Sequence, residues 1–363
     1  MAEPTLDDLR RYAIARTLFK PTTLLRAVQR LGFVQADPIR APARAQDLIL
    51  RHRVRDYHAG DLERRYSRLA IEEDCLVNYG FLPREHLALM HPREPRRRWT
   101  AVERRRAADI LAFIRERGAT HPREVELQFA HGRVTNYWGG ASNASTHLLG
   151  AMHHRGLLRV VRRDSGTRVY AAVDHPAADP SPAERARRAA ALIDLVVRKY
   201  APLPAPSLTY LTRLLISYGA PHLAVETQAA VREARTRLAS VRHDGIDWFW
   251  PADEMPLRHG GDEALRLLAP FDPIVWDRRR FELLWDWTYK FEAYTPPAQR
   301  KLGYYALPML WQERAIGWAS VTLDDKGRLQ ARFGFAGKPP RGAAFRAALD
   351  DELQRMTAFL GGG

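Results

Sequence analysis

Two polar side chains, Gln35 and Asp37, interrupt the apolar stretch LGFVQADPIR at residues 31–40. The stretch is typical of a strand that follows a helix, which is expected to end at Gly32, and strand residues two apart point to the same face. A half-buried amide and carboxylate on one face are costly unless they have partners or a task. A carboxylate can attract a developing cation and take a proton from water, while an amide can hold that water. The pair is thus a candidate for acid–base chemistry; the alternative is a structural Asp that bonds a backbone N–H beside Pro38, with an exposed Gln.

Length and composition set the broad class of protein. The 363 residues, 46% of them hydrophobic, are enough for two to four domains with real cores. The single cysteine, Cys75, excludes a disulfide framework and a CxxC metal or redox motif. The N-terminal residues MAEPTLDDLR lack the apolar core of a signal peptide, and there is no apolar run long enough to span a membrane. We therefore expect a soluble, cytoplasmic protein that does not act at a membrane.

The charge balance favours nucleic acid as a partner. The net charge is +15 and the sequence pI is near 10.3, although only six of the 57 basic residues are lysines. The preference for arginine fits a GC-rich genome, but the positive excess itself is typical of a nucleic-acid binder. Eight arginines form the candidate DNA-contacting set, four just after the Gln35–Asp37 stretch and four on a hairpin at 159–171: Arg40, Arg44, Arg51, Arg53, Arg159, Arg162, Arg163 and Arg168. The alternative for both groups is an ordinary solvated face.

The elements that surround these residues follow a repeated pattern. Residues 103–173 read as three helices and then a hairpin around the turn Asp164-Ser165-Gly166. This is the order of a winged helix, a variant of the helix-turn-helix. Residues 182–252 resemble a second copy, and residues 5–60 an abbreviated third, by pattern and not by sequence.

The C-terminal part has a different composition. From about residue 265 it is rich in aromatic residues and strand-like, which predicts a small antiparallel sheet or barrel followed by a helix at 342–359. Trp276, Trp285 and Trp287 could stack on bases, but core packing is the favoured interpretation. The predicted fold is mainly α with β, built of tandem winged-helix units and a C-terminal antiparallel β-barrel. The predicted domains are 1–98, 99–178, 179–262 and 263–363.

Several motif classes are absent from the sequence. There is no GxxxxGK[ST] or GxGxxG loop, no HExxH and no GxSxG. We therefore expect no nucleotide cofactor, no metal and no serine nucleophile, so that any chemistry depends on an acid, an amide and water.

The chain resembles the AlkZ/YcaQ family of bacterial tandem winged-helix DNA glycosylases. The matching segments are GFVQADPIRAPARAQDLILRHRV, LAPFDPIVWDRRRFELLWDW and FEAYTPPAQRKLGYYALPMLW. The resemblance implies excision of N7-alkylated purines from double-stranded DNA, the unhooking of interstrand crosslinks in some members, and three winged-helix units with a C-terminal barrel. The family's signature of Gln, an apolar residue and then Gln or Asp falls on Gln35, Ala36 and Asp37, in the Asp form typical of the YcaQ-like branch.

The resemblance makes the expected protein a monofunctional DNA N-glycosylase, monomeric, without cofactor and associated with the nucleoid. The alternative is a non-catalytic winged-helix transcriptional regulator, which would bind one sequence and leave damaged DNA intact. One stretch departs from the family: where an aromatic EYW-x-H run is usual, this chain has EEDCLVNYGFLP. Asp74 and Cys75 replace the aromatic pair and Val77 stands where His is common, so the range of substrates is expected to be narrower or different, with loss of activity as the alternative.

Overall fold

The computed structural model describes residues 3–94, 97–135, 141–174, 180–256 and 263–361. Contacts between Cα atoms divide the chain into two units. The first contains Met1–Leu62, Asp194–Leu211 and Arg232–Gly363, and the second contains Glu63–Ile193 and Thr212–Val231. The four domain boundaries proposed from the sequence stay a prediction. None of the helices in the described residues is long and apolar enough to cross a membrane.

The first unit begins with short helices that end close to the candidate residues. α1 (Leu6–Thr17) starts at a capping box in which Thr5 and Asp8 bond each other's backbone N–H. α2 (Leu24–Leu31) ends at Gly32, whose φ of 68° is left-handed, and a Cβ there would lie 2.5 Å from Leu195. β1 (Val34–Gln35) follows, and then α3 (Ala45–Leu50). The helix stop predicted at Gly32 is therefore confirmed.

A small sheet and parts of three longer helices belong to the same unit. The helices are α9 (Pro182–Tyr200), α10 (Ala205–Tyr218) and α11 (Ala224–Arg237), with residues in both units. The strands β8 (Leu203–Pro204), β9 (Ala239–His243) and β10 (Ile246–Trp250) form an antiparallel sheet with β10 in the middle.

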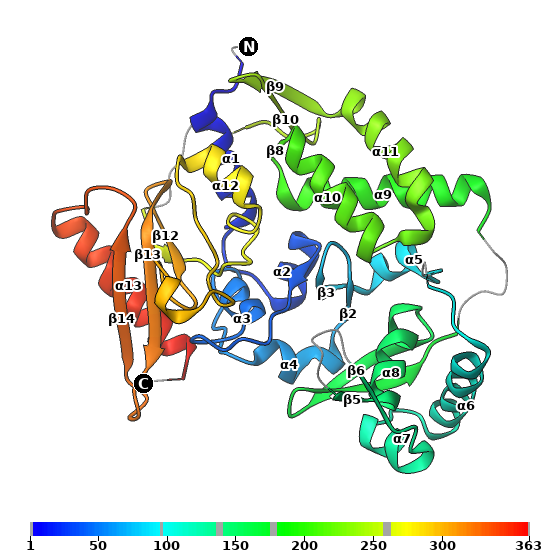
Figure 1. Ribbon diagram of the computed structural model, residues 1–363. Helices are drawn as coiled ribbons and strands as arrows, with labels where there is room; N and C mark the ends of the chain where they lie inside the picture. Colours follow the sequence, from blue (N-terminus) through cyan, green and yellow to red (C-terminus); the bar gives the residue numbers. More distant parts are fainter. Residues whose placement is uncertain (1–2, 95–96, 136–140, 175–179, 257–262, 362–363) are drawn as a thin grey trace. The chain divides into compact units, whose positions relative to one another are not determined.

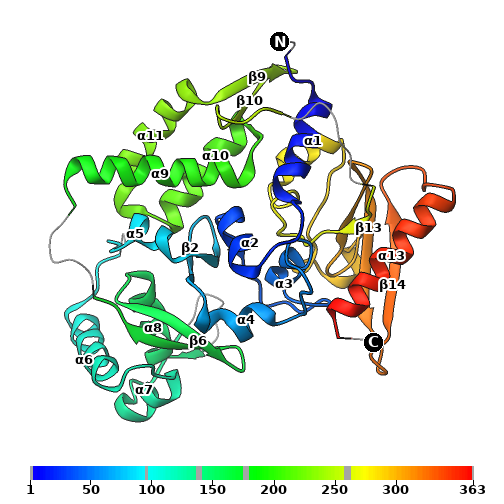
Figure 2. The ribbon, with the colours of Figure 1, turned by 180° about the vertical axis from the view of Figure 1, so that it is seen from behind.

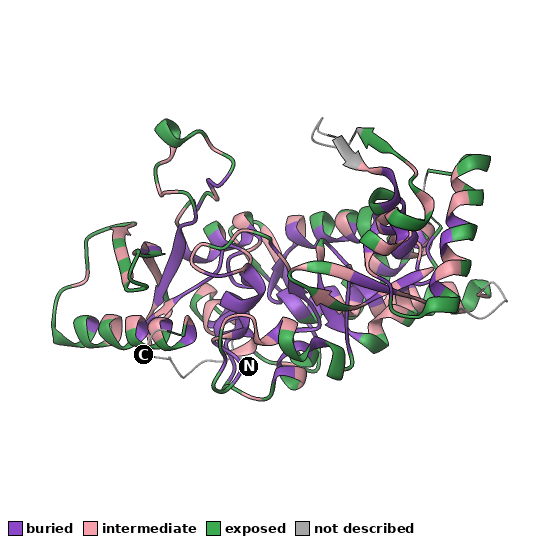
Figure 3. Cartoon of the chain, turned by 90° about the horizontal axis from the view of Figure 1, so that it is seen from below, coloured by how far each residue is buried: buried purple, intermediate pink, exposed green. Residues whose placement is uncertain are grey.

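The C-terminal strands form an open sheet. β11 (Arg266–Leu267), β12 (Leu307–Trp311), β13 (Arg314–Leu323) and β14 (Leu329–Phe335) are antiparallel in that order, so β11 and β14 are edges (Figure 1). A closed barrel, which the sequence suggested, would require these two edges to pair, and in the described residues they do not. α13 (Ala343–Phe359) confirms the predicted terminal helix, and Figure 3 shows its buried and exposed sides.

The aromatic stretch after residue 275 is helical, which corrects the strand-like interpretation. α12 covers Arg278–Trp285 and starts at Asp277, whose side chain accepts a hydrogen bond from the Arg280 N–H. This cap, with buried residues at i, i+3 and i+4 (Phe281, Leu284 and Trp285), favours a helix over a strand. α12 lies beside α1 in both views (Figures 1 and 2). The shared core of this region includes Leu9, Ile14, Trp248, Phe281 and Leu310.

The second unit contains the predicted sequence of three helices and a hairpin. α6 (Ala101–Arg117), α7 (Pro122–Phe129) and α8 (Ala144–His154) precede the strands β6 (Leu158–Asp164) and β7 (Thr167–Ala172) (Figure 1). The loop Ser165-Gly166 has positive φ at both residues, as a two-residue hairpin turn requires. The unit also contains the hairpin of β2 (Ile71–Cys75) and β3 (Tyr79–Pro83), and the short pair β4 (Arg133–Thr135) and β5 (Ala141–Asn143). Short helical segments complete the described elements: α4 (Asp61–Arg65), which spans the boundary between the units, α5 (Leu87–Met90) and the single 3-10 turns at Tyr66–Arg68, Arg84–His86, Pro221–Leu223 and Pro297–Gln299.

Candidate active site

The segment that contains Gln35 and Asp37 is held by hydrogen bonds on both sides. The Lys199 ammonium donates to the carbonyl oxygen of Phe33, and the Asp37 N–H donates to the side-chain oxygen of Gln46 on α3 at 3.3 Å. β1 ends at Gln35, so Asp37 lies beyond the strand. This corrects the sequence analysis, which placed both residues within it. The chain turns there because Pro38 has no N–H and the Asp37 carboxylate accepts the Ile39 N–H at 2.9 Å.

One of the two carboxylate oxygens of Asp37 is unbonded by the described residues. Oδ1 bonds Ile39, whereas Oδ2 accepts no hydrogen bond from the described residues, and the residue is 9% exposed. Burial raises the pKa of Asp37, and the hydrogen bond from Ile39 opposes this only in part. A carboxylate with a raised pKa is a stronger base than one in water. Asp37 is therefore a buried carboxylate with one oxygen that no described residue bonds.

The amide of Gln35 has a fixed orientation. The Trp276 indole Nε1–H donates to Gln35 Oε1 at 2.5 Å, across 241 residues of sequence. Because an indole N–H can only donate, the amide oxygen must face Trp276 and the NH2 group must face the other way. That NH2 group donates to no acceptor in the described residues. Gln35 therefore offers a donor, and the sequence had left open both its donor and its acceptor.

Trp276 belongs to a row of three aromatic rings. Its ring centroid lies 5.4 Å from that of Tyr200 and 6.1 Å from that of Tyr210. Trp285 is 8% exposed and belongs to the hydrophobic core, and Trp287 packs against that core. The sequence had favoured such core packing for all three tryptophans. Trp276 is different, because it is half-buried and bonds a candidate catalytic side chain.

Tyr305 is a further polar group near Asp37. Its pKa is raised well above the usual value, first by burial and then by the negative charge of Asp37. The residue is 3% exposed, and its hydroxyl has no hydrogen-bond partner in the described residues. The sequence pattern indicated none of Tyr305, Gln46 and Lys199, because they carry no motif. It singled out Trp276 only as a possible stacking residue and not as a partner of Gln35.

Two of the four arginines after this segment are structural. Arg53 is fully buried, and its guanidinium bonds both carboxylate oxygens of Asp272, at 2.8 and 3.0 Å. Arg51 pairs with the buried carboxylate of Glu352 and donates to the carbonyl of Leu267 at 3.0 Å. Neither guanidinium is available to a phosphate at the surface, so we remove both from the set of DNA contacts.

The other two arginines of this group keep their place in the set. Arg40 is exposed and Arg44 is half-buried just before α3. Both stay candidates for contact with phosphate.

The hairpin arginines divide in the same way. Arg159 pairs with Glu72, Arg163 bonds Glu73 at 2.6 and 2.7 Å, and Arg168 lies 3.8 Å from Glu73. The fourth, Arg162, is exposed, and among the described residues it pairs only with Asp164 on the same strand. Because the other three pair with buried acids, Arg162 is the one hairpin arginine that stays a candidate for contact with DNA.

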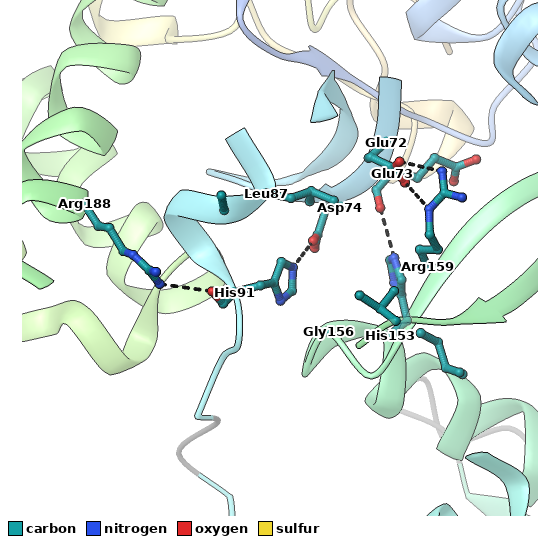
Figure 4. Close-up of a pocket in the computed structure, with 12 residues that line it drawn as sticks. Glu72, Glu73, Asp74, Leu87, His91, His153, Gly156, Arg159 and Arg188 are labelled. Carbon is teal, nitrogen blue, oxygen red and sulfur yellow. Dashed lines mark hydrogen bonds and ion pairs between the residues drawn. The ribbon is translucent and has the colours of Figure 1, made fainter. Parts of the chain in front are cut away.

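Those acids stand on β2 and line a cavity of about 260 Å³ (Figure 4). Burial opposes ionisation of Glu73, but the hydrogen bond and charge of Arg163 outweigh it and lower the pKa of Glu73. Asp74 bonds Arg93 at 2.7 Å and contacts His91, and burial together with the charge of Arg93 lowers the pKa of His91 to about 4. This stretch, where the sequence departs from the family, is therefore a buried ion-pair network.

The two replacements beside this network are also inside the unit. Val77 is 1% exposed, and burial raises the pKa of the half-buried Cys75 thiol to about 11. A thiol with such a pKa stays protonated at neutral pH and is a poor nucleophile. In the described residues no three His, Cys, Asp or Glu side chains are grouped to hold a metal ion.

A buried carboxylate beside an oriented amide, on a basic chain of helices and hairpins, fits the class of enzymes that act on nucleic acid. The chain belongs to the AlkZ-like family of DNA glycosylases, whose family model matches residues 28–359. Its fold is similar to that of Streptomyces sahachiroi DNA glycosylase AlkZ, with a TM-score of 0.62 and 15% sequence identity over 99% of this chain and 98% of that one. The predicted mixture of helix and sheet is thereby confirmed.

Proposed function

We propose that this chain hydrolyses the N-glycosidic bond of N7-alkylated purines in double-stranded DNA. The observation that supports this most is Asp37, a buried carboxylate with a raised pKa and one unbonded oxygen, two residues from an amide that Trp276 fixes. Alkylation at N7 makes the purine cationic, so the base is a good leaving group. The enzyme then has to stabilise positive charge at the sugar and supply water.

The proposed reaction assigns one task to each side chain. Asp37 Oδ2 faces the developing oxocarbenium ion and accepts a proton from water as its oxygen attacks C1′. The C1′–N9 bond breaks and its electron pair returns to the purine, which leaves as a neutral 7-alkylpurine. Gln35 donates an N–H to the oxygen of the attacking water and so sets its direction. The products are the free base, an abasic site and a proton.

Water, and not a lysine, is the proposed nucleophile, which makes the enzyme monofunctional. Burial, reinforced by the charge of Arg53, lowers the pKa of Lys199 to about 7, but its ammonium is bonded to the Phe33 carbonyl and the residue is 5% exposed. We therefore assign Lys199 to holding the Phe33 segment and not to forming a Schiff base at C1′. Arg40, Arg44 and Arg162 are the proposed phosphate contacts.

Base release from defined duplexes tests the proposal. The protein is incubated with a duplex that carries one 7-methylguanine, with an unmodified duplex and with a duplex crosslinked through N7 of guanine. Free 7-methylguanine and an intact abasic strand are expected from the first and nothing from the second; release from the third would show unhooking. Tight binding to one sequence without base release would instead identify a regulator, and strand cleavage at the abasic site would exclude the monofunctional reaction.

The same preparations show the oligomeric state. A monomer is expected in light scattering at the concentrations of the assay, because the proposed chemistry uses groups of a single chain.

A further inference from the structure

The chain just before β12 forms a loop whose two ends are held together by one buried carboxylate. Glu292 is 2% exposed, and its Oε2 accepts the N–H of Leu302 at 2.7 Å and that of Gly303 at 3.3 Å. The backbone carbonyl of Glu292 accepts the Thr295 N–H at 3.0 Å. Residues 293–301 therefore leave and rejoin the first unit at one place, as a compact surface loop.

The interior of this 293–301 loop is also restrained. Pro296 and Pro297 fix the backbone angle φ at two consecutive positions. Arg300 donates to the Thr295 carbonyl at 2.8 Å and lies over the ring of Tyr304, 5.0 Å from its centroid. A loop that is already ordered loses little conformational entropy when it binds. The 293–301 loop can thus meet a partner as a rigid element.

The loop carries the most exposed ring among the described Phe, Tyr and Trp residues. Tyr294 is 76% exposed, and its ring packs edge to face on Phe291, with 6.1 Å between the centroids and 78° between the planes. A single exposed apolar side chain is common on protein surfaces and indicates nothing by itself. Here, however, the ring stands on a rigid support, and an aromatic face held in this way can stack on a nucleobase.

Two ring contacts connect Tyr294 with the candidate active site. Phe291 also packs edge to face on Tyr305, with 5.3 Å between the centroids. Tyr305 is the buried tyrosine on which the negative charge of Asp37 acts. Because successive base pairs are about 3.4 Å apart, the two contacts place Tyr294 within about three base steps of Tyr305. The ring is therefore within reach of the base pairs beside a lesion held at Asp37.

The charges around Tyr294 are complementary to a polyanion. Lys290 and Lys301, two of the six lysines of the chain, are exposed and form no ion pair in the described residues. Glu292, which lies between them in sequence, is buried and bonds backbone N–H groups. Exposed ammonium groups beside an aromatic face are the combination that binds nucleic acid, since the charges contact phosphates and the ring contacts bases.

We propose that the 293–301 loop contacts damaged DNA and that Tyr294 enters a base step within about three pairs of the lesion, where its ring stacks on a base. Lys290 and Lys301 contact the phosphates beside that step. The insertion has to unstack bases, and this costs least where a base is damaged or missing. The inference rests on the proposed glycosylase function, and it adds a residue that positions the damaged duplex at Asp37.

Photocrosslinking on the full chain shows whether Tyr294 stacks on a base. The duplex carries a tetrahydrofuran analogue of an abasic site, which a glycosylase cannot hydrolyse, and 5-iodouracil at successive positions on either side of it. Excited 5-iodouracil reacts with an aromatic side chain stacked on it, and peptide mapping identifies that residue. We expect a crosslink to Tyr294 that is retained in Tyr294→Phe and lost in Tyr294→Ala.

Fluorescence anisotropy measures how much the ring contributes to binding. Tyr294→Ala should lower the affinity for the tetrahydrofuran duplex about tenfold, as the loss of one stacked ring predicts, and the affinity for an intact duplex by less. Tyr294→Phe keeps the stacking face and should bind like the wild type. Tyr218→Ala is the matched control, because Tyr218 is 50% exposed on α10, and it should leave both affinities unchanged.

Lys290→Ala and Lys301→Ala test the phosphate contacts. Each should weaken binding to damaged and intact duplexes alike and reduce the slope of log affinity against log salt concentration by about one. Lys326→Ala, in the exposed turn between β13 and β14, is their control. Thermal unfolding shows that each variant is folded before its binding is compared.

Unchanged affinity of a folded Tyr294→Ala for the tetrahydrofuran duplex, or crosslinks that map only to other residues, overturns the inference even if base release is observed. Self-association that Tyr294→Ala abolishes while DNA binding is unchanged also overturns it and assigns the loop to a protein contact. If 7-methylguanine is not released but the Tyr294 crosslink and the loss of affinity are found, the proposed function alone is overturned. The two claims therefore fail separately.

Discussion

The substitution Asp37→Asn tests the catalytic role of Asp37 in a variant that is expected to keep the fold. Asn can still accept the Ile39 N–H with its side-chain oxygen, so the turn at Pro38 is retained. It removes a buried charge whose pKa is raised, and each unit of such a rise corresponds to about 1.4 kcal/mol of stability lost on ionisation. The replacement of a charged hydrogen bond by a neutral one opposes this gain by about 1 kcal/mol. We therefore expect the free energy of unfolding at neutral pH to fall by no more than about 1 kcal/mol, or to rise.

The pH dependence of stability follows from the same raised pKa. A carboxyl group that binds its proton more readily in the folded state stabilises the protein as pH falls through the folded pKa toward the unfolded value near 3.8. Wild type should thus gain stability relative to Asp37→Asn on acidification. Urea unfolding at a series of pH values measures this difference directly.

The effect of Asp37→Asn on activity should be large. A positioned general base contributes about 10²- to 10⁴-fold, which equals roughly 2.7–5.4 kcal/mol of barrier at 1.36 kcal/mol per tenfold. Single-turnover release of 7-methylguanine, with enzyme in excess over duplex, isolates the bond-breaking step. The wild-type rate should fall on the acid side around a pKa above the ordinary value of Asp, and this limb should be absent in the variant.

Asp325→Asn, in an exposed turn, is the matched control and should release base at the wild-type rate. A folded Asp37→Asn that keeps the wild-type rate and pH profile would remove the carboxylate from the mechanism. A loss of more than about 3 kcal/mol of stability would show that Asp37 is structural, as expected for the removal of one member of a buried network.

Three further predictions concern other side chains of the site and its surroundings. Trp276→Phe removes the only hydrogen bond to the Gln35 oxygen in the described residues, so the single-turnover rate should fall about tenfold, and less than additively with Gln35→Ala. Arg53→Met leaves its buried carboxylate partner unpaired and should lower the free energy of unfolding by about 3–5 kcal/mol, measured in urea. Arg162→Ala should weaken binding to any duplex, measured by fluorescence anisotropy, and should reduce the slope of log affinity against log salt concentration by about one. Arg163→Ala should chiefly destabilise the fold, which thermal unfolding would show.

Local signals in the sequence predicted much of the fold. The helix stop at Gly32, the hairpin turn at Ser165-Gly166 and the order of helices before it are set by neighbouring residues, and the structure confirms them. The stretch after residue 275 was wrongly predicted to be strand-like, because aromatic residues are common both in strands and in hydrophobic cores. There the cap at Asp277 and the helical spacing of apolar residues were the better guide.

Only part of the candidate site could be predicted from the sequence. Gln35 and Asp37 are close in the chain, so their spacing could be read directly. Trp276 and Lys199, which orient and anchor them, lie 241 and 166 residues away from the groups they bond. No periodicity relates such distant positions, and only the folded chain brings them together.

The arginines show why charge alone is a poor guide to a DNA surface. A guanidinium that bonds both oxygens of a buried carboxylate cannot leave it for a phosphate without exposing an unpaired buried charge. Arg53 with Asp272, and Arg163 with Glu73, are of this kind, so part of the positive excess maintains the fold. The acids that hold these arginines lie far from them in sequence, by 219 and 90 residues. An arginine is therefore a credible phosphate contact only when the structure shows that no buried acid retains it, and this criterion favours Arg162 over its three neighbours on the hairpin.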